Sequence, residues 1–151
     1  MNFTIRQLTE EDLQDGKGFF KTLSNLSDVA DLDIATRKVV FKKASGLGIY
    51  FLVAISEEND TKGQIISTVK LIVEPKFYHG GRAAGHIEDV VTRKGFEGQG
   101  LSKALLSEAI KIAKESDCYK VILDCRAELV SFYSNLGLEE YDVCMRLDFK
   151  K

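Results

Sequence analysis

The sequence predicts a mixed α/β fold, a single domain over residues 1–151 whose sheet has both parallel and antiparallel strands. Two β-rich runs, at 49–55 and 64–73, flank the polar stretch SEENDTKG, which is typical of a turn and indicates an antiparallel hairpin. A strand, a Gly-rich turn, a helix and another strand follow over 87–125, which is the pattern of a βαβ unit with nearly parallel strands. We expect roughly six or seven strands and about four helices around one core.

The first part of the chain is predicted to supply the elements that precede the hairpin. Thr9 and Asp12 resemble a capping box. Apolar residues at helical spacing follow, although Gly16 and Gly18 weaken the helix they predict. The expected elements are a strand over 4–8, a helix through 13–26 and a second helix over 33–43.

The second part of the chain repeats the strand–helix alternation. The helix after the Gly-rich loop has one apolar face, and the run YKVILDC is typical of a buried strand. Gly137 is well placed to end a short helix. The expected elements are a strand over 85–92, a loop over 93–100, a helix over 100–115, a strand over 119–125, a short helix over 127–135 and a last strand over 141–149.

Composition excludes several classes of function. A net charge of −2 gives no general attraction to nucleic acid or anionic membrane, so an anionic ligand needs a local site. The odd count of three Cys, with no C-x-x-C pair, favours reduced thiols in a cytoplasmic compartment. Two His without partner spacing argue against a metal site. The first residues lack the apolar core of a secretory signal, and no apolar run is long enough to span a membrane.

The Gly-rich loop is the first candidate binding element. Glu97-Gly-Gln-Gly-Leu-Ser-Lys103 connects a strand to an amphipathic helix, where free N–H groups favour an anion such as a pyrophosphate. It is not a dinucleotide fingerprint, because Lys103 stands at the third Gly position, and it lacks the G-K-[ST] of a P-loop. From spacing alone, a plain helix-entry turn is an equally good interpretation.

Four motifs in order carry a resemblance to a known family. They are HIEDVV at 86–91, GQGLSKALL at 98–106, CYKVILDC at 118–125 and the pair Phe132-Tyr133. Together they resemble the GNAT superfamily of N-acetyltransferases, and more narrowly the eukaryotic-type glucosamine 6-phosphate N-acetyltransferases. The resemblance implies the GNAT acyl-CoA N-acyltransferase fold and transfer of an acetyl group from acetyl-CoA to the amine of D-glucosamine 6-phosphate. The product, N-acetylglucosamine 6-phosphate, serves UDP-N-acetylglucosamine synthesis.

The resemblance also implies where acetyl-CoA binds. The strand before the loop is expected to splay from the strand that begins near Lys120, leaving a slot for the pantetheine arm. The implied cofactor-binding residues are Val90, Val91, Thr92, Gly98, Gln99, Gly100, Leu101, Ser102, Lys103, Asp124 and Tyr133. Glu97, Ser102 and Leu129 depart from the family pattern at positions near the cofactor. We expect Glu97 to point outward.

Three residues are the catalytic candidates. By resemblance, Tyr133 protonates the departing thiolate, Asp124 holds the acceptor amine, and Glu88 holds a water that accepts the amine proton. Each has a simpler alternative from the residues alone: a core tyrosine, a structural carboxylate buried in an apolar strand, and a salt bridge or solvated edge for Glu88 with Asp89. No Ser/His/Asp arrangement points to a covalent acyl-enzyme.

The acceptor site is expected to read the sugar and its phosphate. The implied residues are Ser27, Lys76, Phe77, Tyr78, His79, Glu88, Asp89, Val90, Tyr119, Lys120 and Arg146. In the resembling family this site is completed across a homodimer interface, so we expect a homodimer. Two alternatives stay open, namely a GNAT enzyme for another amine and a non-catalytic acetyl-CoA-binding module.

Overall fold

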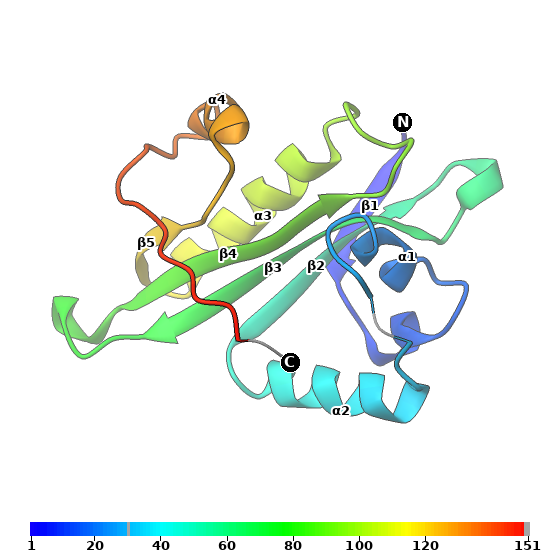
Figure 1. Cartoon of the computed structure of the whole chain (residues 1–151), viewed down its shortest axis with the longest axis horizontal. Helices are drawn as coiled ribbons and strands as arrows, with labels where there is room; N and C mark the ends of the chain where they lie inside the picture. The colour runs from blue at the N-terminus through cyan, green and yellow to red at the C-terminus, as the bar shows by residue number, and fades with distance from the viewer. Residues whose placement is uncertain (30, 150–151) are drawn as a thin grey trace.

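The computed structural model describes residues 1–29 and 31–149, which form a mixed sheet covered by helices (Figure 1). The sheet has five strands in the described residues, in the order β1-β2-β3-β4-β5. Neighbours from β1 to β4 are antiparallel, and β5 runs parallel to β4, as the hairpin and the βαβ pattern predict. The strands are β1 (Phe3–Gln7), β2 (Ile49–Ser56), β3 (Ile65–Pro75), β4 (Ala83–Thr92) and β5 (Cys118–Ile122).

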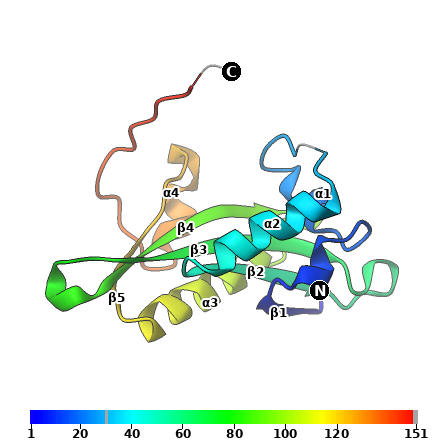
Figure 2. The ribbon, with the colours of Figure 1, turned by 90° about the horizontal axis from the view of Figure 1, so that it is seen from below.

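Helices cover both faces of the sheet. In Figure 2, α3 lies on one face, and α1 and α2 lie on the other. The described α-helices are α1 (Phe19–Leu23), α2 (Ile34–Ser45), α3 (Leu101–Glu115) and α4 (Val130–Ser134). Because side chains alternate along a strand, β2 feeds both cores: Leu52 packs in the cluster that includes Leu105 of α3, and Val53 packs in the cluster that includes Phe19 of α1.

The first predicted helix is shorter than its apolar pattern suggests. A 3₁₀ turn over Glu10–Leu13 comes first, and the α-helix begins only at Phe19. Gly16 and Gly18 lie between the two, with φ angles of 82° and 90° that interrupt a right-handed helix. The predicted capping box is present, since the Asp12 carboxylate accepts from the backbone N–H of Thr9 at 2.8 Å.

The predicted strand over 119–125 is wrong at its end. β5 stops at Ile122, so Asp124 and Cys125 lie beyond it and are exposed. Pairing between β4 and β5 ends at His86 and Ile122 in the described chain, so no partner strand keeps the later residues extended. The expected buried Asp124 is therefore exposed.

The predicted last strand over 141–149 is also wrong, and the expected six or seven strands become five. No regular secondary structure is assigned to this segment, which rises away from the sheet on the side opposite α3 (Figure 2). Its apolar residues alternate with polar ones but are 78–91% exposed: Tyr141, Val143, Met145, Leu147 and Phe149. The alternation is typical of a strand, yet a strand forms only where a neighbour accepts its hydrogen bonds.

Candidate active site

The Gly-rich loop presents open backbone at the start of α3. Gly100 is the N-cap of the helix and has a φ of 80°, and Leu101 is buried and anchors the first turn. A Cβ built at Gly98 or Gly100 meets no atom within 4 Å, so this side of the loop is open. Free N–H groups in the first turn of a helix favour an anion, and an anion site at this loop stays a prediction.

The side chain of Ser102 faces the sheet. Its hydroxyl lies 2.9 Å from the hydroxyl of Thr92, which lies 2.8 Å from that of Ser67. Ser67 in turn donates to the backbone carbonyl of Val91 at 2.9 Å. This chain of hydroxyl groups fixes the first turn of α3 to β3 and β4, so the serine that departs from the family pattern uses its side chain for packing the loop.

Glu97 is exposed but folds back on its own loop. Its Oε2 accepts a hydrogen bond from the backbone N–H of Gly95 at 2.6 Å. The exposed carboxylate thus makes a local contact, because a short turn offers it a free amide two residues away.

A bulge in β4 shapes the middle of the site. The register with β3 shifts between Thr68 and Lys70, and Asp89 has a φ of 52°. Lys70 Nζ holds Asp89 Oδ2 at 2.5 Å, while Glu88 is exposed. Val90 is half-buried against the main core, so the bulge separates a core-facing valine from two carboxylates of the candidate acceptor side.

Asp124 has a neighbour that sequence reasoning missed. The thiol of Cys144 donates to Asp124 Oδ2 at 3.3 Å. The pKa of the Cys144 thiol is raised by this hydrogen bond first, then by the charge of Asp124, with a further contribution from Glu88. The thiol therefore stays protonated and works as a donor beside both candidate carboxylates. Nothing local in the sequence signals a contact across 20 residues.

Tyr133 lies in α4 and is buried, with its ring packed edge-on against Phe132 at 5.0 Å between centroids. Burial raises the pKa of its phenol, with a smaller contribution from a charge on Cys125. A raised pKa keeps the hydroxyl protonated at neutral pH, which is the state a proton donor needs. Leu129, the N-cap residue of α4, is exposed.

A second group of predicted residues gathers at the tip of the β3–β4 hairpin. The His79 ring lies 4.1 Å from the ring of Tyr119, and Tyr78 packs edge-on against Tyr119 at 6.2 Å. Lys120 Nζ lies 5.5 Å from the same ring, and Phe77 is fully exposed. The structure thus brings four of the acceptor candidates into one aromatic and cationic cluster.

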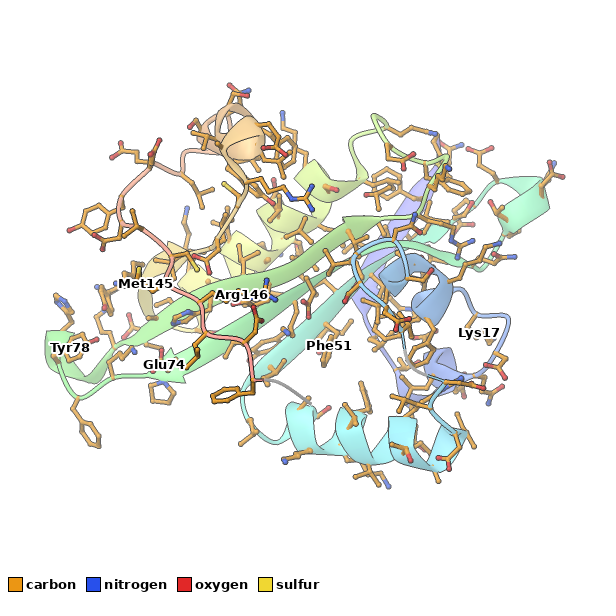
Figure 3. All side chains as sticks on the ribbon, viewed as in Figure 1. Lys17, Phe51, Glu74, Tyr78, Met145 and Arg146 are labelled. Atoms are coloured by element: carbon orange, nitrogen blue, oxygen red, sulfur yellow. The ribbon has the colours of Figure 1, made fainter. Side chains whose placement is uncertain are left out.

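Two acceptor candidates, Ser27 and Arg146, lie elsewhere, whereas Lys76 directly follows β3 and borders the cluster at the hairpin tip. Lys76 pairs with Glu74 at 2.6 Å, Arg146 pairs with Asp148 at 2.7 Å, and Ser27 is exposed after α1. Figure 3 shows Arg146 over the middle of the sheet, away from Tyr78 at the hairpin tip. One chain therefore does not assemble all the predicted phosphate ligands in one place.

Two further classes of site find no support in the described residues. Among 1–29 and 31–149, no group of three or more His, Cys, Asp or Glu is placed to hold a metal ion. No helix in this part of the chain is long and apolar enough to cross a membrane.

The mixed sheet, the bulge in β4 and the Gly-rich loop at the start of α3 are the arrangement expected of an acyltransferase that binds acetyl-CoA, and comparison with known proteins gives the same class. The acetyltransferase (GNAT) family matches residues 19–138, so the chain belongs to this family.

Individual relatives narrow the class. A probable glucosamine 6-phosphate N-acetyltransferase of Oryza sativa is 38% identical over 96% of this chain and 87% of its own. The glucosamine 6-phosphate N-acetyltransferase of Trypanosoma brucei is 34% identical over 98% of this chain and 97% of its own. The crystal structure of the Arabidopsis thaliana enzyme of the same name superposes with a TM-score of 0.91 at 32% identity, covering 99% of this chain and 100% of its own. The chain falls among the glucosamine 6-phosphate N-acetyltransferases.

Substitution of Gly100 tests the loop. Because Gly100 has a φ of 80°, Gly100→Val strains the loop and places methyl groups on its open side. We expect calorimetry to show acetyl-CoA affinity reduced by at least about tenfold. Gly81→Val carries the same strain, at a φ of 82°, before the opposite end of β4 and should bind acetyl-CoA as the parent does. Glu97→Gln keeps the Gly95 contact and should change affinity little. Parent-like affinity in a folded Gly100→Val protein would remove the loop from the cofactor site.

Proposed function

We propose that the protein transfers the acetyl group of acetyl-CoA to the amine of D-glucosamine 6-phosphate by direct attack in a ternary complex. The observation that carries this proposal is the likeness, over 96% and 98% of the chain, to two relatives that bear this name. The product is N-acetylglucosamine 6-phosphate, which suits UDP-N-acetylglucosamine synthesis.

The geometry fits acetyl-CoA. We assign the pyrophosphate to the backbone amides from Gly98 to Lys103, at the start of α3. The acetyl-pantetheine arm is assigned to the backbone of Val90, Val91 and Thr92, where β4 has parted from β5. Acetyl-CoA is a co-substrate here, and no metal is needed for its chemistry.

The reaction requires one bond to form and one to break. The amine lone pair attacks the thioester carbonyl carbon, and the carbon–sulfur bond then breaks to release the thiolate. Tyr133 gives its proton to the thiolate sulfur and recovers one from solvent. Asp124 holds the amine in line, and a water held by Glu88 accepts the proton that the amine loses. The Cys144 contact at 3.3 Å supports an oriented Asp124 carboxylate.

Two observations support a homodimer. Arg146 lies over the middle of the sheet, away from Tyr78 at the hairpin tip, whereas Lys120 lies with Tyr119 in the cluster at that tip, so a single chain does not bring the two cations together (Figure 3). The segment 141–149 exposes five large apolar side chains that need a partner. We propose that a second copy covers this segment and that the two copies together complete the phosphate site around Lys120 and Arg146.

A charge on the apolar face of this segment tests the dimer. Leu147 is 78% exposed in the single chain, so Leu147→Asp costs little within one chain but places a charge in the proposed interface. We expect analytical ultracentrifugation at micromolar concentration to find a dimer for the parent and for Leu147→Val, and a monomer for Leu147→Asp. A monomeric parent would contradict the proposal.

A cytoplasmic location fits the cysteines. Cys118, Cys125 and Cys144 are all free thiols, and the last two are exposed. Exposed free thiols persist in reducing compartments, which supports the proposed location.

The function is tested by measuring thiol release from acetyl-CoA with three acceptors. We expect glucosamine 6-phosphate to be acetylated, and glucosamine and a lysine peptide to be poor acceptors. Efficient reaction with the peptide would favour a GNAT enzyme for another amine. Binding of acetyl-CoA without release on any acceptor would favour a non-catalytic module.

A further inference from the structure

A buried arginine stands where β4 ends and the Gly-rich loop begins. Arg93 is 4% exposed, yet no carboxylate of the described residues lies within ion-pair distance of its guanidinium. Its N–H groups donate only to neutral oxygens. These are Thr22 Oγ1 at 3.3 Å, Gln64 Oε1 at 2.7 Å, the carbonyl of Gly18 at 3.2 Å and the carbonyl of Ile65.

The surroundings are built around this guanidinium. Thr22 is fully buried, and its hydroxyl donates to the carbonyl of Ile65 at 2.9 Å, the same carbonyl that Arg93 contacts. A Cβ at Gly18 would lie 2.0 Å from Arg93 Nη2, so the start of α1 accommodates the charge only because position 18 is glycine. Burying an unpaired charge is costly, and an apolar side chain fills such a space at lower cost.

A second contact joins α1 to the loop at the next residue. With the carboxamide of Asn25 oriented so that each of its atoms has a partner, its oxygen accepts from the backbone N–H of Lys94 at 3.3 Å. Its nitrogen then donates to the carbonyl of Lys21 at 3.2 Å. Two consecutive residues of the loop therefore contact α1 and the turn that follows it. Arg93 does so through its side chain and Lys94 through its backbone.

These contacts link the two halves of the site. The loop that begins at Arg93 is the element assigned to the pyrophosphate, and α1 leads to Ser27, which the family resemblance implies as an acceptor-binding residue. We propose that Arg93 is a positioning residue that couples the cofactor loop to α1, so that binding of CoA orders the acceptor side before the sugar arrives. The proposal rests on the proposed function, since it assumes that CoA binds at this loop.

Hydrogen exchange measured with and without CoA tests the coupling. In the parent, CoA should slow amide exchange both in the first turn of α3 and in α1, residues 19–23. In Arg93→Met we expect CoA affinity by calorimetry to fall by at least about fivefold, with protection retained in α3 and lost in α1. Arg82→Met, at the opposite end of β4, is the matched control and should behave as the parent does. If Arg93 had a purely structural role, Arg93→Met would lower the stability of the protein, but CoA would still slow amide exchange in α1 as it does in the parent.

Thr22→Val keeps the test decisive if Arg93→Met does not fold. It removes one acceptor of the guanidinium while preserving the shape of a fully buried side chain, and it should reduce the protection that CoA confers on α1. Parent-like protection of α1 in the folded variants, or no protection of α1 in the parent when CoA binds, would overturn the coupling. A parent that does not bind CoA would instead refute the proposed function itself, and the coupling with it.

Discussion

Tyr133→Phe is expected to lower kcat by about 10²–10⁴-fold, with little change in the affinity for acetyl-CoA. The phenol is buried in α4, and the substitution removes one oxygen without altering the packing of the ring against Phe132. Steady-state rates and calorimetry on the same preparation measure the two quantities. Tyr50→Phe is the matched control, because Tyr50 is a half-buried residue of β2 outside the candidate site.

If Tyr133 is the general acid, two further results are expected. Burial raises the pKa of its phenol, so the proton donor is present at neutral pH and is lost only above that raised pKa. Acyl donors with a more acidic thiol leaving group need less help from an acid, so the deficit of Tyr133→Phe should shrink with such donors. An equal deficit for all donors would show that Tyr133 does not protonate the leaving sulfur.

Arg146→Ala should raise the KM for glucosamine 6-phosphate by about 10- to 150-fold, because a hydrogen bond to a charged group contributes about 1.5–3 kcal/mol. Arg146 is exposed, and among residues 1–29 and 31–149 its only ion-pair partner is Asp148, so its removal should not disturb the fold. Unphosphorylated glucosamine is the internal control: it should be a poor acceptor for the parent and lose little further in the variant. Equal reaction of both sugars with the parent would refute phosphate reading by Arg146.

Much of the fold follows from local patterns. The two β-rich runs at 49–55 and 64–73, separated by a polar turn, predict the β2–β3 hairpin, and the apolar face of the 100–115 stretch predicts α3, because each pattern is contained within neighbouring residues. The Gly-rich loop is predictable for a similar reason, since positive φ angles and open backbone need glycine.

Pairing and burial at a distance were not predictable in the same way. The alternation of apolar and polar residues over 141–149 predicts a strand, but it does not show whether another strand lies beside it to pair with. The apolar run before Asp124 likewise does not reveal that β5 ends at Ile122. The Cys144–Asp124 contact and the buried guanidinium of Arg93 depend on residues 20 to 75 positions apart, which no local pattern reports.

The exposed segment 141–149 has a consequence for how the protein must be handled. If a second copy covers its apolar side chains, dilution below the dissociation constant of the dimer separates Arg146 from the rest of the phosphate site. Specific activity would then depend on enzyme concentration. The initial rate per mole of enzyme would be lower in assays at nanomolar enzyme than in assays at micromolar enzyme. Rates strictly proportional to enzyme down to the monomeric range would show that each chain works alone. Asp142, Arg146 and Asp148 alternate with these apolar residues and carry charge along the segment, which limits indiscriminate strand addition while the partner is absent.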